Sequence, residues 1–538
     1  MTHFPQDFPL SIPSLVFEAA ERYPDLAAIE DGDRVVSYRQ LPDEALKVCR
    51  ALMALGVGQG DRVAIWAPNC ALWVMAAIGL QMAGAVLVPL NTRMKANEAA
   101  DILNRSSAKV LLSVGEFLNT DYPASLLPVW PSNLQLVAVM GPCAGTYSDA
   151  AHPIECWDSF IDRGADVEEA VARDRALSVG PEALSDLMFT SGTTGKPKGV
   201  MSTHGACLQA FRVFTQVLGL RAGDRYLVVN PFFHAFGYKA GWLSCLIAGC
   251  TILPEQVFDA KRVLRRIHQD KVTVLPGPPT LYLSLLLAPE LAFTDLSSLR
   301  VASTGASTIP PVLISKMRNE LGFETVTTAY GLTECGGLAT ICDPTDAAEI
   351  IAGTSGKAIA GTEVGIFGIN ADNQGQRLKH GETGEIRIRG FHVMQGYFDN
   401  PQATAETIDE DGWLHTGDLG ELDSAGNLKI TGRLKDMFIV GGFNCYPAEI
   451  EGQLAEHPAI AQTAVVGVPD ERMGEVGCAF VVLKPGKHCS EPELIAWCRQ
   501  QMANYKVPRF VRFIEVLPVN ASNKVLKSEL LAGFFPEH

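Results

Sequence analysis

The sequence lacks several features that would mark other classes of protein. Its 538 residues contain no internal repeat and no low-complexity tract, which argues against repeat arrays and disordered chains. Positive charge is scarce, with 44 Lys and Arg against 60 Asp and Glu, so nucleic acid is not expected as a partner. None of the 13 cysteines forms a C-x-x-C pair, and we expect reduced thiols and no structural zinc.

Signals for export or membrane insertion are also missing. The first residues show no basic stretch followed by an apolar one, and the last residues match no peroxisomal address. Residues 63–92 carry no charge and could span a bilayer by length, but glycines and Pro89 interrupt them. A buried helix over 71–82 followed by a buried strand over 85–88 fits better. We expect a cytoplasmic protein without a transmembrane segment; the oligomeric state stays open, and a homodimer is compatible with the sequence.

The chain is too long for one hydrophobic core, because single cores stop growing near roughly 250 to 300 residues. Between about residues 25 and 430, short β-branched runs alternate with helical patterns, which predicts an α/β fold of stacked βαβ units with parallel sheets. The clearest runs lie at 62–66, 109–113, 226–229 and 272–275.

The texture changes in the last third of the chain. After about Gly356, a run at 385–389 and a hairpin pattern over 421–431 predict a small β subdomain. Beyond Arg433 the pattern is that of a compact α+β domain, with a helix opened by the capping box of Ser490 and Glu493. Its strands are expected at 463–468, 479–483 and 511–516. We therefore expect a large N-terminal domain over residues 1–434 and a small C-terminal domain over residues 435–538.

The segment that is richest in polar side chains follows an apolar run at 187–189. Residues 189–199 hold three glycines, four hydroxyls and two lysines, which are the groups that bind a polyphosphate. A Walker loop is excluded, because Thr190 stands where its first glycine would be and Pro197 follows Lys196. The alternative is a flexible surface loop. The candidate binding residues are Thr190, Ser191, Gly192, Thr193, Thr194, Gly195 and Lys196.

This loop resembles the phosphate-binding signature of the adenylate-forming enzymes, the superfamily of acyl-CoA synthetases, nonribosomal-peptide adenylation domains and beetle luciferases. Further segments resemble that superfamily in order along nearly the whole chain. The resemblance implies a large N-terminal domain and a small mobile C-terminal domain, with ATP, Mg²⁺ and coenzyme A as the small molecules bound.

Residues 328–334 resemble the family's adenosine-binding segment. The resemblance implies that Tyr330 stacks on adenine, that Thr333 donates to the α-phosphate and that Glu334 helps to hold Mg²⁺. These residue types suit those tasks, although an isolated Tyr is more often a core residue and an isolated Glu a solvated one. Further nucleotide contacts are implied for Gly305, Ala306, Ser307, Thr328, Ala329 and Gly331.

Three more segments complete the catalytic resemblance. Asp418, in 414–418, is implied to accept hydrogen bonds from the ribose, and Arg433, in 432–436, to reach the nucleotide; the two could instead form a structural ion pair. Lys435 is implied to be the hinge. Residues 518–524 resemble the loop of the catalytic lysine, Lys524, with Asn523 where the family usually has Gly; Asn tolerates a positive φ well. Lys524, Glu334 and Thr190 are thus the catalytic candidates.

Residues 440–444 resemble the strand that lines the family's pantetheine tunnel. Two adjacent glycines permit close backbone approach, although an ordinary turn is the alternative. The candidate tunnel residues are Gly441, Gly442 and Phe443.

The acyl pocket is expected around His234, Phe236, Gly237 and Gly305. Amino-acid-adenylating members carry an aspartate in this region, whereas here no acid follows until Glu255, so an uncharged acyl body is favoured. A core aromatic cluster is the alternative interpretation for His234 and Phe236.

Segments 230–241, 273–282 and 441–451 resemble a subgroup of CoA ligases that act on the propanoate left on the C and D rings in bacterial steroid breakdown. We expect an ATP-dependent acid:CoA ligase for such a ring-bearing propanoate, with a medium- or long-chain fatty acid as the alternative substrate. Lys239 could donate to a ring carbonyl or lie on a solvated face. A luciferase-like monooxygenase and an inactive binding homologue are the alternatives of other classes.

Overall fold

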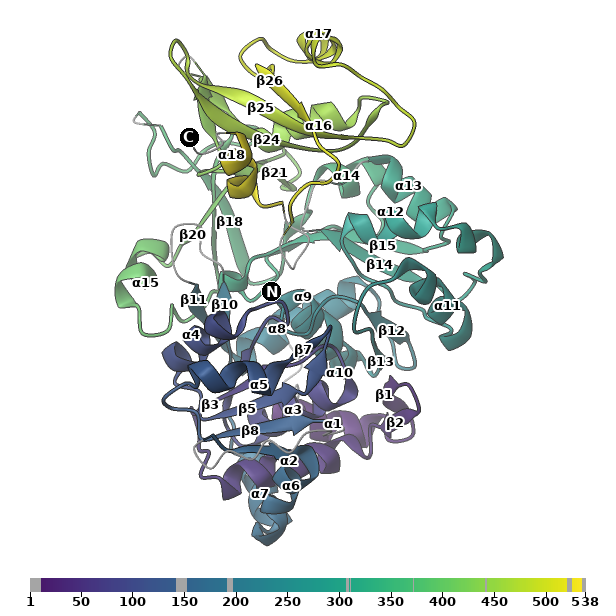
Figure 1. Cartoon of the computed structure of the whole chain (residues 1–538), viewed down its shortest axis with the longest axis vertical. Helices are drawn as coiled ribbons and strands as arrows, with labels where there is room; N and C mark the ends of the chain where they lie inside the picture. The colour runs from purple at the N-terminus through teal and green to yellow at the C-terminus, as the bar shows by residue number, and fades with distance from the viewer. Residues whose placement is uncertain are drawn as a thin grey trace.

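The computed structural model describes residues 11–141, 152–190, 197–305, 309, 311–370, 372–440, 443–519 and 525–534. Stacked sheets and their helices form the lower and middle parts of the molecule, and a small α+β unit lies at its top (Figure 1). The predicted α/β class and the small C-terminal unit are confirmed.

A seven-stranded sheet forms the base, in the order β11-β10-β4-β3-β5-β8-β9. Its strands are parallel except for the β10–β11 hairpin. Alternate side chains enter two cores: Val63 and Ile65 face the core with α1–α3, whereas Ala64 and Trp66 face the core with α4 and α5. The strands are β3 (Arg62–Trp66), β4 (Val86–Pro89), β5 (Val110–Val114), β8 (Leu136–Met140), β9 (Ile154–Cys156), β10 (Leu184–Thr190) and β11 (Lys198–Thr203). The helices are α1 (Ile12–Arg22), α2 (Leu41–Ala54), α3 (Ala71–Met82), α4 (Ala96–Ser106), α5 (Tyr122–Leu126), α6 (Trp157–Asp162) and α7 (Glu169–Leu177).

The uncharged stretch is internal, as predicted. Every residue of α3 except Leu72 is buried, and a Cβ on Gly79 would lie 2.5 Å from the Ala45 carbonyl oxygen, so α2 and α3 pack backbone to backbone. Among the described residues no helix is long and apolar enough to cross a membrane.

A second group of strands carries the middle of the chain. Four strands lie in the order β2-β1-β13-β12, and four more in the order β14-β15-β16-β17. Single bridges from Val274 to β12 and to β14 join the two sets. The strand expected at 272–275 is thus wrong as a full strand: only Val274 pairs, with Tyr226 on one side and Val301 on the other. The strands are β1 (Ala27–Asp31), β2 (Arg34–Ser37), β12 (Arg225–Val228), β13 (Thr251–Pro254), β14 (Val301–Gly305), β15 (Thr325–Tyr330), β16 (Thr340–Ile341) and β17 (Lys357–Ala358). The helices are α8 (His204–Val217), α9 (Ala235–Gly237), the π-helical η3 (Tyr238–Leu243), α10 (Ser244–Ala248), α11 (Ala260–Asp270), α12 (Pro279–Leu287), α13 (Pro311–Asn319) and α14 (Ala348–Gly353).

The small β subdomain is an antiparallel sheet, β18 (Thr362–Phe367), β19 (Gly384–Gly390), β20 (Leu414–Leu422) and β21 (Leu428–Arg433). The expected hairpin is β20–β21, closed by the pair Leu422 and Leu428. Helix α15 (Pro401–Thr407) lies between β19 and β20 in sequence.

The C-terminal unit has its own core and its own sheet, β23-β22-β25-β24, with β26 beside β25. The predicted capping box is confirmed, since Ser490 N donates to Glu493 Oε2 over 2.8 Å at the start of α17. The elements are β22 (Phe438–Val440), β23 (Phe443–Cys445), α16 (Pro447–Ala455), β24 (Ile460–Asp470), β25 (Gly474–Leu483), α17 (Glu491–Gln501), β26 (Phe510–Phe513) and α18 (Lys527–Phe534). The domain boundary at residue 435 stays a prediction.

Two expectations about local chemistry need correction. Residues 440–444 are not one strand: β22 ends at Val440 and β23, its antiparallel partner, begins at Phe443. Eleven of the described cysteines are free, but Cys156 is disulfide-bonded, so the expectation of reduced thiols fails there.

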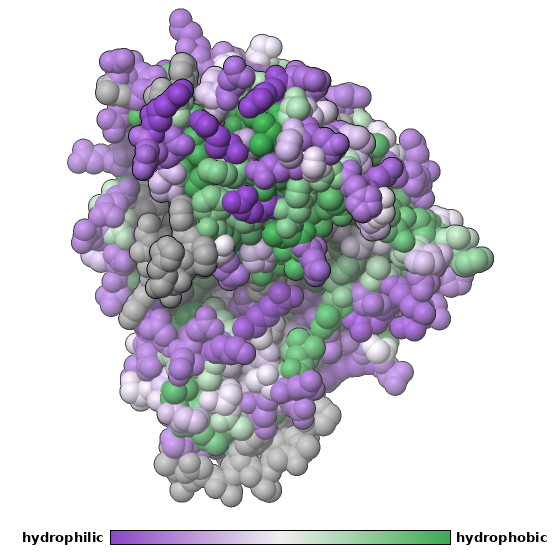
Figure 2. Space-filling model, turned by 45° about the horizontal axis from the view of Figure 1, so that its top comes forward, coloured by the Kyte–Doolittle hydropathy of each residue, from purple (hydrophilic) through white to green (hydrophobic). Residues whose placement is uncertain are grey.

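Apolar side chains also reach the surface of the upper part. Figure 2 shows apolar surface gathered in the upper middle of its view, with polar surface around it. Exposed apolar residues of the C-terminal unit include Ile439, Phe513 and Val516. Such exposure is typical of surfaces that another part of a protein or a ligand covers.

Candidate active site

The hairpin β10–β11 holds the two ends of the predicted phosphate loop. Thr190 and Lys198 are its last pair, and Thr190 Oγ1 lies 3.4 Å from the Lys198 carbonyl oxygen. The predicted contacts of Ser191, Gly192, Thr193, Thr194, Gly195 and Lys196 lie outside the described residues.

Glu334 reaches the start of this loop from another part of the chain. Its short helix η5 (Thr333–Cys335) follows β15, and Thr190 Oγ1 lies 3.5 Å from Glu334 Oε1. Tyr397 donates its hydroxyl to the same oxygen over 3.0 Å, and the Glu334 carbonyl accepts from Met394 N over 2.8 Å. Two of the predicted catalytic residues, Thr190 and Glu334, are therefore in contact, and Tyr397 of the β subdomain contacts Glu334.

Sequence reasoning missed Tyr397. The residue is fixed by an antiparallel bridge to Val200 on β11, and Lys198 Nζ lies 4.7 Å from its ring centroid. Burial and then the negative charge of Glu334 raise the pKa of Tyr397, so the phenol stays a donor. A single tyrosine in a loop gives no sequence signal of this contact.

Glu334 is a fitting ligand for a hard cation. Its carboxylate is half-buried beside the loop, and no group of three or more His, Cys, Asp or Glu forms a metal cluster in the described parts of the chain. Mg²⁺ in nucleotide sites commonly uses one or two carboxylates together with phosphate oxygens and water, and this residue set suits that mode.

The predicted nucleoside residues meet above the loop. Tyr330 donates its hydroxyl to Asp418 Oδ2 over 2.7 Å, and Arg433 Nε lies 3.0 Å from Asp418 Oδ1. Asp418 and Arg433 are register partners on β20 and β21. Burial, followed by the charge of Asp418, raises the pKa of Tyr330 far above its ordinary value. The ion pair considered as an alternative is therefore present, and contact of either residue with a nucleotide stays a prediction.

Two glycines of this region cannot be larger. Gly305 pairs with Ala329 in the parallel β14–β15 ladder, and a Cβ on Gly305 would lie 2.9 Å from the Ala329 carbonyl oxygen. A Cβ on Gly331 would lie 2.4 Å from the Gly337 carbonyl carbon. Close backbone approach thus shapes the end of β15.

The threonines of this segment differ. Thr328 turns its hydroxyl inward, to the carbonyls of Ile351 at 2.9 Å and Thr354 at 3.0 Å, so only its main chain is available to a ligand. Thr333 is half-buried at the start of η5. Ala306 and Ser307 lie outside the described residues.

The predicted acyl wall is the turn into α9. His234 is exposed, and its Nδ1 accepts from Phe236 N over 3.3 Å. A Cβ on Gly237 would lie 2.2 Å from the Pro231 carbonyl oxygen and 2.3 Å from that of Asn230, which explains the glycine. The core aromatic cluster beside this turn is formed by Trp73, Phe232, Tyr238 and Trp242, and His234 is not part of it.

Two charged residues near the wall are engaged elsewhere. Glu255 is buried and paired with Arg262 and Arg266, so it is not free for an amino group of a substrate. Lys239 is wholly buried, 3.1 Å from Asp186 Oδ1, which contradicts both the solvated-face interpretation and a role as donor to a ring carbonyl.

The remaining candidates belong to the C-terminal side. Lys435 lies exposed in the turn between β21 and β22, and Phe443 opens β23. Gly441, Gly442 and Lys524 lie outside the described residues.

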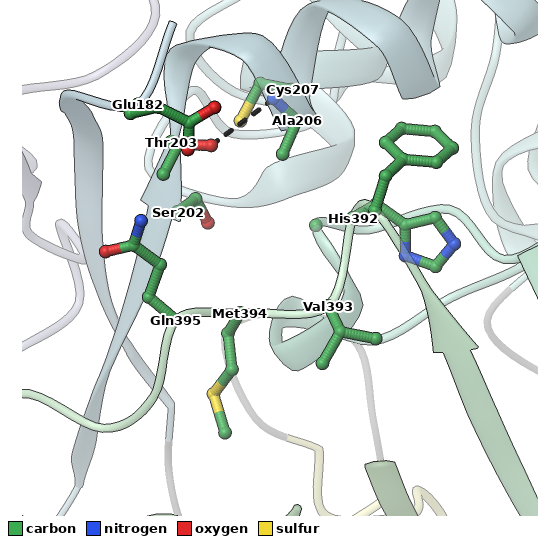
Figure 3. A pocket seen from close by; sticks show the side chains of 11 residues that line it. Glu182, Ser202, Thr203, Ala206, Cys207, His392, Val393, Met394 and Gln395 are labelled. Carbon is green, nitrogen blue, oxygen red and sulfur yellow. Dashed lines mark hydrogen bonds between the residues drawn. The ribbon is translucent and has the colours of Figure 1, made fainter. Parts of the chain in front are cut away.

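A cavity of about 140 Å³ lies between β11 with α8 and the segment 391–395, and Gly336 also lines it. Figure 3 shows Ser202, Thr203 and Cys207 on one side of it and Val393 and Met394 on the other. None of the predicted acyl-pocket residues lines this cavity.

Known proteins resemble this chain over nearly its full length. Residues 16–398 match the AMP-binding enzyme family, and residues 449–524 match the AMP-binding enzyme C-terminal domain. The chain belongs to the AMP-binding enzyme family.

Two curated relatives carry the same name, 3-((3aS,4S,7aS)-7a-methyl-1,5-dioxo-octahydro-1H-inden-4-yl)propanoyl:CoA ligase. The Rhodococcus jostii protein is 46% identical over 97% of this chain and 98% of its own length. The Mycobacterium tuberculosis protein is 47% identical over the same shares. The ATP-bound MatB structure from Rhodopseudomonas palustris superposes with a TM-score of 0.86 at 26% identity, covering 98% of this chain and 99% of that one. Family and fold expectations are thereby confirmed, as is the resemblance to the steroid-propanoate ligase subgroup.

Proposed function

We propose that this AMP-binding enzyme is an ATP-dependent acid:CoA ligase whose acid is a bicyclic, ketone-bearing propanoate. The observation that carries the proposal is the convergence of Thr190 and Glu334 at one end of the site and of Tyr330, Asp418 and Arg433 at the other. A triphosphate and a nucleoside need two such groups of residues. The names of the two curated relatives at 46% and 47% identity support the substrate class.

In the proposed first step, a carboxylate oxygen of the acid attacks the α-phosphorus of ATP, and pyrophosphate leaves. Thr190 and the loop after it donate to the phosphate oxygens, while Lys524 stabilises the charge that gathers during the step. Asp418 and Arg433 fix the nucleoside at the other end. Glu334 would hold Mg²⁺, which supplies positive charge beside the phosphates.

In the second step, the thiol of coenzyme A attacks the acyl carbon, and AMP leaves. We propose that the C-terminal unit turns about Lys435 between the steps and brings the segment of Gly441, Gly442 and Phe443 to the pantetheine. Since the reaction consumes ATP and coenzyme A, the enzyme would act in the cytoplasm. A homodimer stays a prediction that sedimentation can test.

The test is a panel of acids scored by AMP release with and without coenzyme A. We expect release with the bicyclic propanoate to depend on coenzyme A and to exceed that with C12 to C16 fatty acids in kcat/KM. Equal or better values with the fatty acids would refute the substrate class and leave the ligase intact. Oxygen uptake with an acid would indicate a monooxygenase, and absence of AMP with every acid would indicate a binding protein.

The Glu334→Gln variant makes this test specific for the site. It should lose AMP release with every acid, because the carboxylate beside Thr190 becomes neutral. Glu382→Gln is the matched control, since Glu382 is exposed and its Oε2 accepts from Lys379 N.

A further inference from the structure

A buried ion pair joins the acyl wall to the strand that leads into the phosphate loop. Lys239 Nζ lies 3.1 Å from Asp186 Oδ1, and both side chains have 0% exposure. Lys239 belongs to η3, which directly follows α9 and Gly237, whereas Asp186 lies in β10 with Thr190 at its end. The pair therefore connects the two predicted substrate-binding segments through the protein interior.

Both partners are held by further polar contacts. Lys239 Nζ donates to Ser202 Oγ over 3.0 Å, and Asp186 Oδ2 accepts from Ser185 Oγ over 2.7 Å. Cys207 Sγ lies 3.7 Å from the same carboxylate oxygen. Burial is the largest single influence and lowers the pKa of Lys239, but the interactions with Asp186 and Cys207 together outweigh it and leave the pKa above its ordinary value. Lys239 is therefore protonated at neutral pH.

The helix that carries Lys239 has an unusual shape. It is a π-helical turn in which Gly241 adopts φ −86° and ψ −107°, outside the helical region. Such turns are frequent at functional sites. The Lys239 carbonyl accepts from Ser244 Oγ over 2.9 Å, and the Tyr238 hydroxyl accepts from Gln81 Nε2 over 2.9 Å. The orientation of η3 is thus specified by polar contacts on both sides of Lys239.

The surroundings are not a uniformly packed apolar core. Ser202 and Cys207, which contact the pair, also line the cavity of Figure 3. Apolar residues of similar volume often replace a buried ion pair without loss of stability, because desolvation offsets the attraction between the charges. Stability alone therefore does not account for this pair.

We propose that Lys239 and Asp186 are positioning residues for acyl-adenylate formation. The pair fixes the acyl wall at His234–Gly237 relative to Thr190, and it thereby holds the acid's carboxylate oxygen in line with the α-phosphorus of ATP. An error of about 1 Å in such an alignment costs roughly a hundredfold in rate. This inference rests on the proposed ligase function.

The test replaces the pair by apolar residues in the double variant Lys239→Met/Asp186→Leu. We expect a folded protein whose single-turnover pyrophosphate release, at saturating acid and ATP, is at least tenfold slower. The KM for ATP should change less than twofold, and thioester formation from supplied acyl-adenylate should keep its rate. A folded double variant with the parental rate of pyrophosphate release would overturn the proposal.

A matched control separates this pair from ion pairs in general. Arg225 donates to both oxygens of Glu30 over 2.9 and 2.6 Å, and it joins β12 to β1. Arg225→Met/Glu30→Leu should keep the rate of pyrophosphate release, and an equal slowing there would also overturn the proposal.

If the double variant does not fold, Ser202→Ala carries the test, because it removes only the hydroxyl that accepts from Lys239. We expect a two- to tenfold slower first step, and an unchanged rate would contradict the proposal. Failure of the parent protein to release pyrophosphate with any acid would instead refute the ligase function itself.

Discussion

A substitution at Asp418 best distinguishes an effect on nucleotide binding from an effect on acid binding. Asp418 is 7% exposed, and its carboxylate accepts from the Tyr330 hydroxyl over 2.7 Å and pairs with Arg433 Nε over 3.0 Å. Asp418→Asn keeps the shape and removes the charge. Hydrogen bonds that involve a charged group contribute about 1.5 to 3 kcal/mol, so we expect the KM for ATP to rise about ten- to hundredfold.

Tyr330→Phe tests the other side of the same contact. The ring that is predicted to stack on adenine remains, and Asp418 keeps Arg433, so only about 1 kcal/mol or roughly fivefold in the KM for ATP should be lost. Because the two side chains touch, the double variant should show a smaller effect than the product of the single effects.

The assay is initial-rate AMP formation with ATP varied at saturating acid, and then with the acid varied. Tyr282→Phe serves as the control. Tyr282 lies on α12, and its buried hydroxyl donates to the carbonyls of Leu275 over 2.7 Å and Ser303 over 3.2 Å, neither of which belongs to the Asp418 contact. The nucleoside assignment would be refuted if the effect of the double variant equalled the product of the two single effects. A rise in the KM for the acid with an unchanged KM for ATP would also refute it.

Three further predictions address the wall, the lysine loop and pH. Gly237→Ala should raise the KM for the acid and lower the thermal midpoint of unfolding, because the new methyl group would lie 2.2 Å from a backbone oxygen. Such overpacking costs about 1 to 3 kcal/mol. Gly353→Ala is the control and should change neither quantity, because Gly353 has open space around it. Lys524→Ala should slow adenylate formation by about a hundredfold and spare thioester formation from supplied adenylate, and equal damage to both steps would contradict the alternating mechanism. Burial lowers the pKa of His204 to about 3, so the imidazole stays neutral in the folded protein, whereas the unfolded chain protonates it below about pH 6.5. The unfolding free energy of the parent should therefore fall between pH 7 and pH 5 by about 2 kcal/mol more than that of His204→Gln. Urea titrations at the two pH values would measure this difference.

Features set by local pattern were predictable from the sequence. Strand 62–66 and helix 71–82 have the expected bounds, because period and apolar content decide them within one segment. The Ser490–Glu493 capping box is equally local.

Features set by distant partners were not predictable. Lys239 meets Asp186 from another strand, and Tyr397 meets Glu334 from the β subdomain. The sequence does not show which distant residue a lysine after a helix start or a tyrosine in a loop will contact, so the burial of Lys239 and Tyr397 could not be foreseen. The motif residues were found because family resemblance supplied what spacing could not.

The nearly complete burial of helix α3 has a consequence for synthesis on the ribosome. Helix α7, which packs on α3, and strand β10, which accepts a hydrogen bond from Gln81 at Ser185, are translated only after roughly 90 to 110 more residues, which takes several seconds at about 5 to 20 residues per second. During that interval the uncharged residues 63–92 are in the nascent chain with α1 and α2 but without two of the elements that later enclose them. A chaperone that holds short apolar segments would act on this enzyme early, at one identifiable place, before most of its catalytic residues have left the ribosome.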